Sequence, residues 1–164
     1  VVPGASAVIF DQQRSWDEDV RGFLQKFLTS GRLHFFEGSV DSEFSWRQLE
    51  NLHGTGFTHI VSGAALTPTP EEEQELPTKI LDVNLVGTLK CIEWARLRCQ
   101  NLQRLVQVSS DAVLSVLGLI NLPGVKHVAH DAGALPEMNL YALSKVGGES
   151  VVTRYRSLYN MDAV

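Results

Sequence analysis

Residues 5–36 read ASAVIFDQQRSWDEDVRGFLQKFLTSGRLHFF, and this stretch decides the fold class. The apolar run Ala5–Phe10 predicts a strand that ends at Asp11. Apolar residues then recur at spacings of three and four, which predicts a helix over Asp17–Ser30. A second apolar run, Leu33–Phe36, predicts another strand. A strand, a helix and a strand in this order indicate a parallel α/β unit.

The same alternation continues along the rest of the chain. Strands are predicted over Thr58–Val61 and Leu105–Val108, and helices over 44–53, 78–99 and 141–159. Residues 114–140 hold prolines and glycines and are predicted to be irregular. The run Glu71-Glu72-Glu73 is interpreted as a solvated loop that leads to a helix. With no internal repeat and no low-complexity linker, we expect a single domain over residues 1–164.

Composition excludes several classes of partner. The 164 residues are 44% hydrophobic and 20% charged, as in an ordinary soluble globular protein. A net charge of −5 gives no reason to expect nucleic acid or an anionic membrane as a partner. Cys91 and Cys99 are eight residues apart on one predicted helix, roughly 12 Å, which is too far for a disulfide. Free thiols, no secretory leader and no membrane-spanning apolar run favour the cytoplasm.

A metal site is not expected. The five histidines do not cluster with carboxylates in the spacing of a metal site. His127 and His130 are three residues apart, but they lie in a predicted loop with no cysteine nearby.

Tyr141 and Lys145 are the most informative pair of side chains in the sequence. A spacing of four residues places both on one face of a helix. An ammonium group there stabilises the phenolate of its neighbour, so the phenol becomes a usable acid and base near neutrality. The alternative is an aromatic residue packed at its edge beside a solvated lysine.

Two polar residues follow predicted strands, where ligands bind in open α/β sheets. Asp11 is placed to accept hydrogen bonds from the hydroxyls of an adenosine ribose and to repel a 2′-phosphate. It is equally well interpreted as a loop aspartate that caps the next segment. Ser110 is placed to hold a substrate carbonyl or alcohol. On its position alone, a turn serine that bonds to nearby backbone is the better interpretation of Ser110.

Small and polar residues mark two further positions. The run Gly63-Ala64-Ala65 after the third strand would let backbone approach a ligand closely, or allow tight packing of strand on helix. Asn84 interrupts an otherwise regular helix, which suggests that it bridges backbone groups or binds a water near the phenol. Gly87 is better explained by close packing.

These pieces, in this order, resemble the extended short-chain dehydrogenase/reductase family, the NAD-dependent sugar epimerases and dehydratases. The matching stretches cover nearly the whole chain: Asp11 after a strand, Gly38-Ser39-Val40, Ser62-Gly63-Ala64-Ala65, Asn84-Leu85-Val86-Gly87-Thr88, Val108 to Val113, and Tyr141-x-x-x-Lys145 with Glu149 four residues further on. The fold that the resemblance implies is α/β, a partial Rossmann-like, doubly wound parallel sheet.

The resemblance also implies a chemistry and a set of roles. Tyr141 would be the general acid and base, and Lys145 its partner and a ligand of the nicotinamide ribose. Ser110 would hold the reacting oxygen of the substrate, a sugar or a nucleotide sugar. The cofactor would be NAD, and the residues expected to bind it are Asp11, Ser39, Val40, Gly63, Ala64, Ala65, Asn84, Tyr141 and Lys145.

The chain departs from the family pattern in three places. Ser39 stands where the family usually has an aspartate on the adenine, and Ser62 stands where many members have histidine. The glycine-rich turn that binds the pyrophosphate is absent, and Gly54-x-Gly56 does not replace it. We therefore expect an incomplete copy, or a part, of a longer enzyme. An intact reading frame that starts at Val1, with cooperative folding of the purified chain, would contradict this expectation.

Three alternatives stay open at this point. The chain is an active oxidoreductase, epimerase or dehydratase; or a non-catalytic relative that senses a dinucleotide or binds a partner; or a fragment that is inactive alone. The sequence does not decide between net oxidation, epimerisation and dehydration. The resemblance further implies a homodimer formed through the two long helices.

Overall fold

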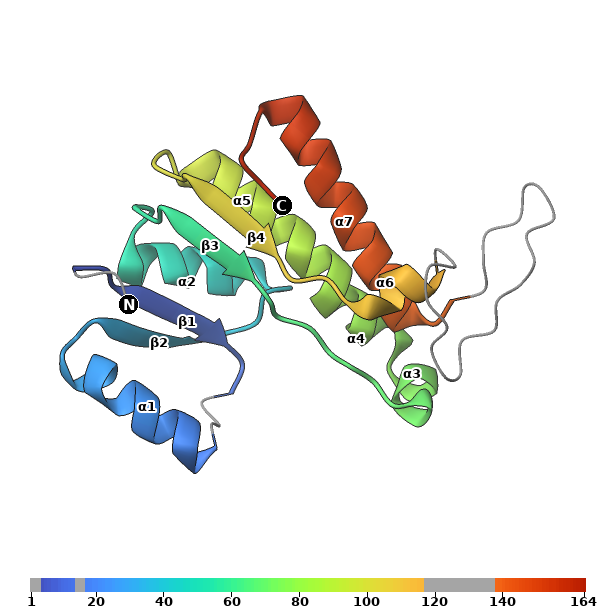
Figure 1. The fold of residues 1–164 in the computed structure, drawn as a ribbon, viewed down its shortest axis with the longest axis horizontal. Helices are drawn as coiled ribbons and strands as arrows, with labels where there is room; N and C mark the ends of the chain where they lie inside the picture. The colour runs from blue at the N-terminus through green and yellow to red at the C-terminus, as the bar shows by residue number, and fades with distance from the viewer. Residues whose placement is uncertain (1–3, 14–16, 117–137) are drawn as a thin grey trace. The chain divides into compact units, whose positions relative to one another are not determined.

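The computed structural model describes residues 4–13, 17–116 and 138–164 (Figure 1). The chain divides into two compact units, Val1–Gly54 and Thr55–Val164. The first unit holds β1 (Ala7–Asp11), α1 (Glu18–Thr29), β2 (Leu33–Glu37) and α2 (Glu43–His53). The second unit holds β3 (His59–Ser62), α3 (Pro70–Glu75), α4 (Pro77–Leu81), the π-helical turn η1 (Asp82–Val86), α5 (Gly87–Arg98), β4 (Arg104–Gln107), α6 (Asp111–Val116) and α7 (Leu140–Tyr159).

The first unit contains the predicted strand–helix–strand. β1 pairs with β2 in parallel, and the register runs from Ala7 opposite Leu33 to Asp11 opposite Glu37. The ladder continues for one step, because the N–H of Gly38 donates to the carbonyl of Asp11 at 2.9 Å. Both strands therefore end side by side, each with a carboxylate as its last residue.

Aromatic packing forms the core of the first unit. The ring of Phe10 lies edge-on to Phe36 and Trp46, with centroids 5.1 Å and 4.9 Å apart. The indole N–H of Trp46 donates to the carbonyl of Val40 at 2.8 Å, which satisfies its polar edge. Gly38 is required here, because a Cβ at this position would lie 2.9 Å from both phenylalanine rings. By contrast, α1 has no buried residue.

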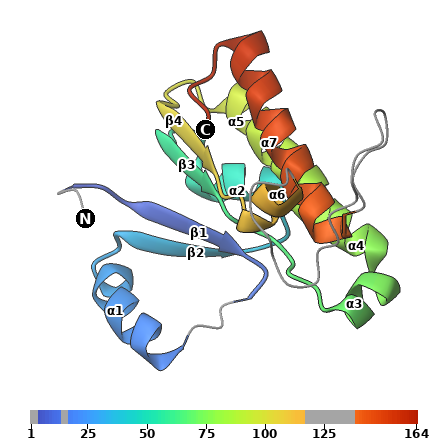
Figure 2. The same cartoon turned by 45° about the vertical axis from the view of Figure 1, so that its right-hand side comes forward.

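The second unit packs helices against a second parallel pair of strands. β3 pairs with β4, from His59 opposite Arg104 to Ser62 opposite Gln107. Helices α5 and α7 lie side by side, as Figures 1 and 2 both show. The core consists of apolar side chains from β4 and the helices, including Ile80, Val83, Ile92, Ala95, Leu105 and Val152.

The predicted fold class is confirmed. Every described strand of these two sheets pairs in parallel, and helices follow strands in the expected α/β order. The described strands form two separate two-stranded sheets. That residues 1–164 form one partial dinucleotide-binding domain stays a prediction.

Three predicted segments differ in the structure. The single helix expected over 78–99 is divided into α4, η1 and α5. The loop expected around Glu71–Glu73 is the short helix α3. It begins with Pro70, and a capping box between Thr69 and Glu72 stabilises its N-terminus. The first residues of the irregular segment 114–140 belong to α6, and its end enters α7. The rest of it, including His127 and His130, lies outside the described residues.

Candidate active site

The start of α7 places the tyrosine and lysine of the site. Asn139 caps the helix, since its side chain accepts a hydrogen bond from the N–H of Ala142 at 2.8 Å. Tyr141 therefore lies in the first turn and Lys145 one turn further on. The Nζ atom of Lys145 lies over the ring of Tyr141, 5.6 Å from its centroid. The predicted shared face is confirmed, while the roles of both side chains in catalysis stay predictions.

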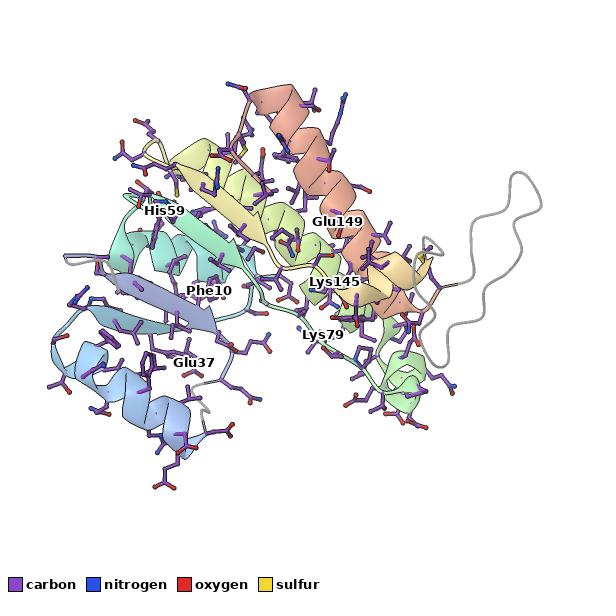
Figure 3. All side chains as sticks on the ribbon, viewed as in Figure 1. Phe10, Glu37, His59, Lys79, Lys145 and Glu149 are labelled. Atoms are coloured by element: carbon purple, nitrogen blue, oxygen red, sulfur yellow. The ribbon has the colours of Figure 1, made fainter. Side chains whose placement is uncertain are left out.

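Lys145, labelled in Figure 3, is buried, with 6% of the residue exposed. Nζ donates one hydrogen bond, to the carbonyl oxygen of Val108 at 3.0 Å. An ammonium has three donors. Among the described residues no other hydrogen-bond partner of Nζ is found, so two of its donors are unpaired within that part of the chain.

Asn84 fixes the loop that follows β3. Its Oδ1 accepts from the N–H of Leu66 at 2.7 Å, and its Nδ2 donates to the carbonyl of Leu66 at 2.9 Å. Nδ2 also donates to Oγ of Ser144 at 3.1 Å. The prediction that Asn84 bridges backbone groups is confirmed. It lies at the centre of η1, and π-helical turns are frequent at functional sites.

Ser144 connects this network to the tyrosine. It is 1% exposed, and its hydroxyl donates to the carbonyl of Tyr141 at 2.7 Å. Ser144 is not among the site residues predicted from the sequence. The signal that could have found it is a serine on the same turn as Tyr141 and Lys145, where a helix interior ordinarily disfavours serine.

Ser110 makes local hydrogen bonds. Its hydroxyl accepts from the N–H of Ala112 at 3.2 Å and donates to Oδ1 of Asp111 at 3.1 Å. These are the bonds of a turn serine, the alternative interpretation given above, and they lie at the start of α6. The preceding residue, Ser109, donates instead to Oε1 of Glu149 on α7 at 2.5 Å. Glu149 was part of the family pattern in the sequence, without a predicted role.

The small residues after β3 are partly exposed to solvent. Gly63 and Ala64 are exposed, and Ala65 is half-buried. A Cβ at Gly63 would meet Val108 at 3.5 Å, an ordinary contact, so packing does not require glycine there. Gly63 and Ala64 are exposed, and their contact with a ligand stays a prediction. Ser62, which replaces the family's histidine, hydrogen-bonds to the thiol of Cys91.

The predicted residues of the first unit gather at the ends of β1 and β2. Asp11 is exposed, and its Oδ1 accepts from the N–H of Gln13 at 3.2 Å. The hydroxyl of Ser39 accepts from Nε2 of Gln12 at 2.5 Å and donates to the carboxylate of Asp41. Asp41, two places after the position where the family has its aspartate, is thus joined to Ser39 itself. Val40 contributes its carbonyl to Trp46.

Both cysteines are free and buried, so the predicted absence of a disulfide is confirmed. Burial raises the pKa of the Cys91 thiol to about 12. A cysteine that stays protonated is a poor nucleophile, which excludes Cys91 as a reactive group near neutral pH.

No cluster of three or more metal-ligating side chains occurs in the part of the chain that the structure describes. In that part, no helix is both long and apolar enough to span a membrane.

A cavity of about 510 Å³ runs along α7. Its lining residues are Val113 of α6 together with Val146, Glu149, Ser150, Thr153, Arg154 and Ser157 of α7. Tyr141, Lys145 and Ser110 do not line it. The predicted catalytic side chains therefore do not line this cavity, although Val146, the residue after Lys145, does.

Solved structures of other proteins share this fold. The dTDP-glucose 4,6-dehydratase DesIV from Streptomyces venezuelae, solved with NAD and TYD bound, matches with a TM-score of 0.68 and 22% identity. That match covers 99% of this chain and 45% of DesIV. The UDP-Glc/GlcNAc 4-epimerase from Campylobacter jejuni matches with a TM-score of 0.66 and 19% identity, over 95% of this chain and 43% of the epimerase. A comparison with curated protein sequences found no match.

The arrangement defines an α/β protein of the short-chain dehydrogenase/reductase type, with parallel strands and a Tyr-x-x-x-Lys helix. A sequence model of the NAD dependent epimerase/dehydratase family matches residues 10–164. The chain therefore belongs to this family, as the resemblance implied, and NAD is the cofactor of the family. The chain spans less than half the length of the two solved structures named above.

Proposed function

We propose that this chain carries the cofactor and proton-transfer side of an NAD-dependent oxidoreductase, epimerase or dehydratase that acts on a sugar or a nucleotide sugar. The observation that carries the proposal is the ammonium of the buried Lys145, 5.6 Å from the centroid of the Tyr141 ring, with two donors that have no partner among the described residues. A buried charge is costly unless something hydrogen-bonds to it. A diol such as the hydroxyl pair of a ribose fits these donors.

The proposed reaction is hydride transfer between a substrate carbon and the nicotinamide ring, the chemistry that NAD supplies when it is bound. Tyr141 accepts the proton of the substrate hydroxyl as that carbon is oxidised, and returns it when the carbonyl is reduced. The charge of Lys145 stabilises the phenolate that this transfer forms. Ser110 holds the reacting oxygen, which requires its hydroxyl to leave Asp111 and turn to the substrate.

Charge at the ends of β1 and β2 supports NAD over NADP. Asp11 is exposed and opposes Glu37 across the parallel ladder, so two carboxylates lie together at the strand ends. A 2′-phosphate placed beside them would be repelled. The adenosine ribose of NAD instead offers hydroxyls that a carboxylate accepts. Arg14, the nearest cation in the sequence, lies outside the described residues.

Calorimetric titration of the chain with NAD and with NADP tests the cofactor part of this proposal. We expect saturable NAD binding and weaker NADP binding. A Tyr141→Phe variant should keep its NAD affinity and lose turnover of the substrate. Turnover that survives this change would remove Tyr141 from the mechanism, and preferred binding of NADP would remove Asp11 as the ribose ligand.

A second candidate function is a non-catalytic relative that senses a dinucleotide. The observation that favours it is the hydroxyl of Ser110, which is engaged by Asp111 and Ala112. Ser39 in place of the family's aspartate favours it as well. NAD binding without turnover of any sugar nucleotide, in a protein that also carries a substrate lobe, would select this candidate over the first.

We also propose a homodimer and a cytoplasmic location. Leucines on α5 and α7 are exposed, among them Leu89, Leu97 and Leu158 at 40%, 56% and 50%. Apolar side chains left open on two adjacent helices support a helix-to-helix contact between copies. Sedimentation equilibrium of the purified chain would measure it, and a monomer at high concentration would contradict it. The free thiols of Cys91 and Cys99 support a reducing compartment.

A further inference from the structure

The segment that leaves β4 is held by two side chains of α7. Nζ of Lys145 donates to the carbonyl of Val108, and Oγ of Ser109 donates to Oε1 of Glu149. Lys145 and Glu149 are four residues apart, so they share one face of the helix with Tyr141. Figure 3 labels Lys145 and Glu149, both on α7. Two consecutive residues after β4 are thus bonded to two consecutive turns of α7.

The same segment is held on its other sides. The N–H of Val108 donates to the carbonyl of Ser62 at 2.9 Å, which extends the ladder with β3. Ser110 accepts from the N–H of Ala112 and so joins the start of α6. Ser109 lies between these two anchors. The bond from its hydroxyl to Glu149 is the contact that ties the residue before Ser110 to the helix of Tyr141.

An ion pair with Lys145 does not explain the orientation of the Glu149 side chain. A lysine and a glutamate at this spacing ordinarily face each other on a helix surface. In the described part of the chain the two form no ion pair, because Lys145 points to Val108 and Glu149 points to Ser109. A hydrogen bond to a carboxylate is stronger than one between neutral groups. The carboxylate of Glu149 is thus directed to a hydroxyl 40 residues away in sequence.

We propose that Glu149 is a positioning residue, which fixes Ser109 and thereby sets the place of Ser110 relative to Tyr141. This inference rests on the proposed function, in which Ser110 and Tyr141 touch the substrate. Through Ser109, Glu149 acts on the distance and orientation between Ser110 and Tyr141. The proposal needs no new chemistry, since no bond to the substrate forms or breaks at Glu149.

Four variants test the role of the carboxylate. Glu149→Leu removes the acceptor, and Ser109→Ala removes the donor. Glu149→Gln keeps an oxygen that can accept the same hydrogen bond. Ser150→Ala is the matched control, because Ser150 is the next residue of α7 and its hydroxyl donates within the helix, to the carbonyl of Val146 at 2.9 Å.

The first readout needs neither cofactor nor substrate. The N–H of Ala112 is bonded to Ser110, so its hydrogen exchange reports whether this segment stays in place. We expect exchange about tenfold faster in Glu149→Leu and Ser109→Ala, as for the loss of one hydrogen bond. Exchange in Glu149→Gln and Ser150→Ala should match that of the unaltered chain.

The second readout is turnover of a sugar nucleotide, measured in a protein that joins this chain to a substrate lobe. Glu149→Leu should lower kcat by about tenfold to a hundredfold, since a reacting group misplaced by about 1 Å costs that much. KM and NAD affinity should change little, and Glu149→Gln should restore kcat. A rise in KM together with a fall in kcat that Glu149→Gln fails to restore would mean a structural role, and would overturn the proposal.

The outcome separates this inference from the proposed function. Turnover that survives Tyr141→Phe contradicts the proposed function, while the exchange of Ala112 still decides whether Glu149 holds the segment. If Tyr141→Phe abolishes turnover but Glu149→Leu changes neither exchange nor kcat, the positioning role is wrong and the proposed function stands. Equal effects in Ser150→Ala and Glu149→Leu would also overturn it, because they would report damage to the helix alone.

Discussion

The two units of the chain hold their polar residues in opposite ways. In the first unit Asp11 is exposed and bonds to an N–H two residues away. In the second, Asn84 is 3% exposed and bonds to residues 18 and 60 positions away. An exposed carboxylate is free to meet a ligand and contributes little to folding. A buried amide with three partners is part of the structure itself, so any role it has toward a ligand is inseparable from stability.

The strongest way to break this comparison is Asn84→Leu. The change removes three hydrogen bonds and leaves the N–H and the carbonyl of Leu66 without that partner. We expect the free energy of unfolding to fall by about 3 kcal/mol. Chemical denaturation measures it. The same substitution at the exposed Asn101 is the control and should stay within about 0.5 kcal/mol. A loss below about 1 kcal/mol at Asn84 would mean that the network does not stabilise the second unit.

Lys145→Met separates binding from stability inside the second unit. The carbonyl of Val108 keeps a donor after this change, because Nε2 of Gln107 lies 3.2 Å from it. Removing a buried charge that has no ion-pair partner among the described residues should change the free energy of unfolding by less than about 1 kcal/mol. NAD affinity should fall by about tenfold or more, the effect of losing charge-assisted hydrogen bonds. Unchanged NAD affinity in Lys145→Met would remove Lys145 from the cofactor site.

Asp11→Asn sharpens the comparison from the side of the first unit. Stability should stay within about 0.5 kcal/mol, because the side chain is exposed. The preference for NAD over NADP should weaken by a few-fold up to about tenfold, since one charge that repels a 2′-phosphate is gone. Glu37→Gln removes the neighbouring charge without touching the residue assigned to the ribose. Equal shifts in both variants would show that net charge, and not Asp11 as a ligand, sets the preference.

The smallest effect expected is a pH dependence confined to the first unit. Burial and the nearby His34 lower the pKa of His53 below its ordinary 6.5. The unfolded chain then binds a proton more readily than the folded one, so stability falls as the pH drops through 6.5 toward the lowered value. The effect is small because His53 is only half-buried. Thermal unfolding of the chain and of His53→Gln between pH 7.5 and about 5.5 measures it; an identical slope in both would contradict this assignment.

The sequence predicted those parts of the fold that depend on neighbouring residues. The strand–helix–strand of residues 5–36 follows from periodicity, and each of its elements is found near its predicted bounds. Helix α3 could also have been predicted, because Thr69, Pro70 and Glu72 form a capping box with proline at the first helical position. The prediction of a loop was based on the three consecutive glutamates and did not include the capping box.

The division of the long helix into α4, η1 and α5 could not be predicted from the sequence, for a different reason. Asn84 and Gly87 marked the place, but a π-helical turn is accompanied here by bonds from Asn84 to Leu66 and Ser144, far apart in sequence. The same holds in the candidate site. The shared face of Tyr141 and Lys145 follows from helical spacing, whereas the bonds from Lys145 to Val108 and from Ser109 to Glu149 exist only after β4 and α7 have packed together.

The two buried thiols give the second unit a built-in reporter of its own opening. Cys91 and Cys99 are the two cysteines of the chain, 5% and 4% exposed, and both belong to the unit Thr55–Val164. A thiol-specific reagent reaches them when α5 separates from its surroundings, and unfolding of the first unit alone leaves no thiol to label. The rate of labelling therefore measures how often the second unit opens, and unfolding of the first unit does not contribute to it. Tryptophan fluorescence from Trp16 and Trp46 would follow the first unit in parallel if Trp94, the tryptophan of the second unit, were replaced.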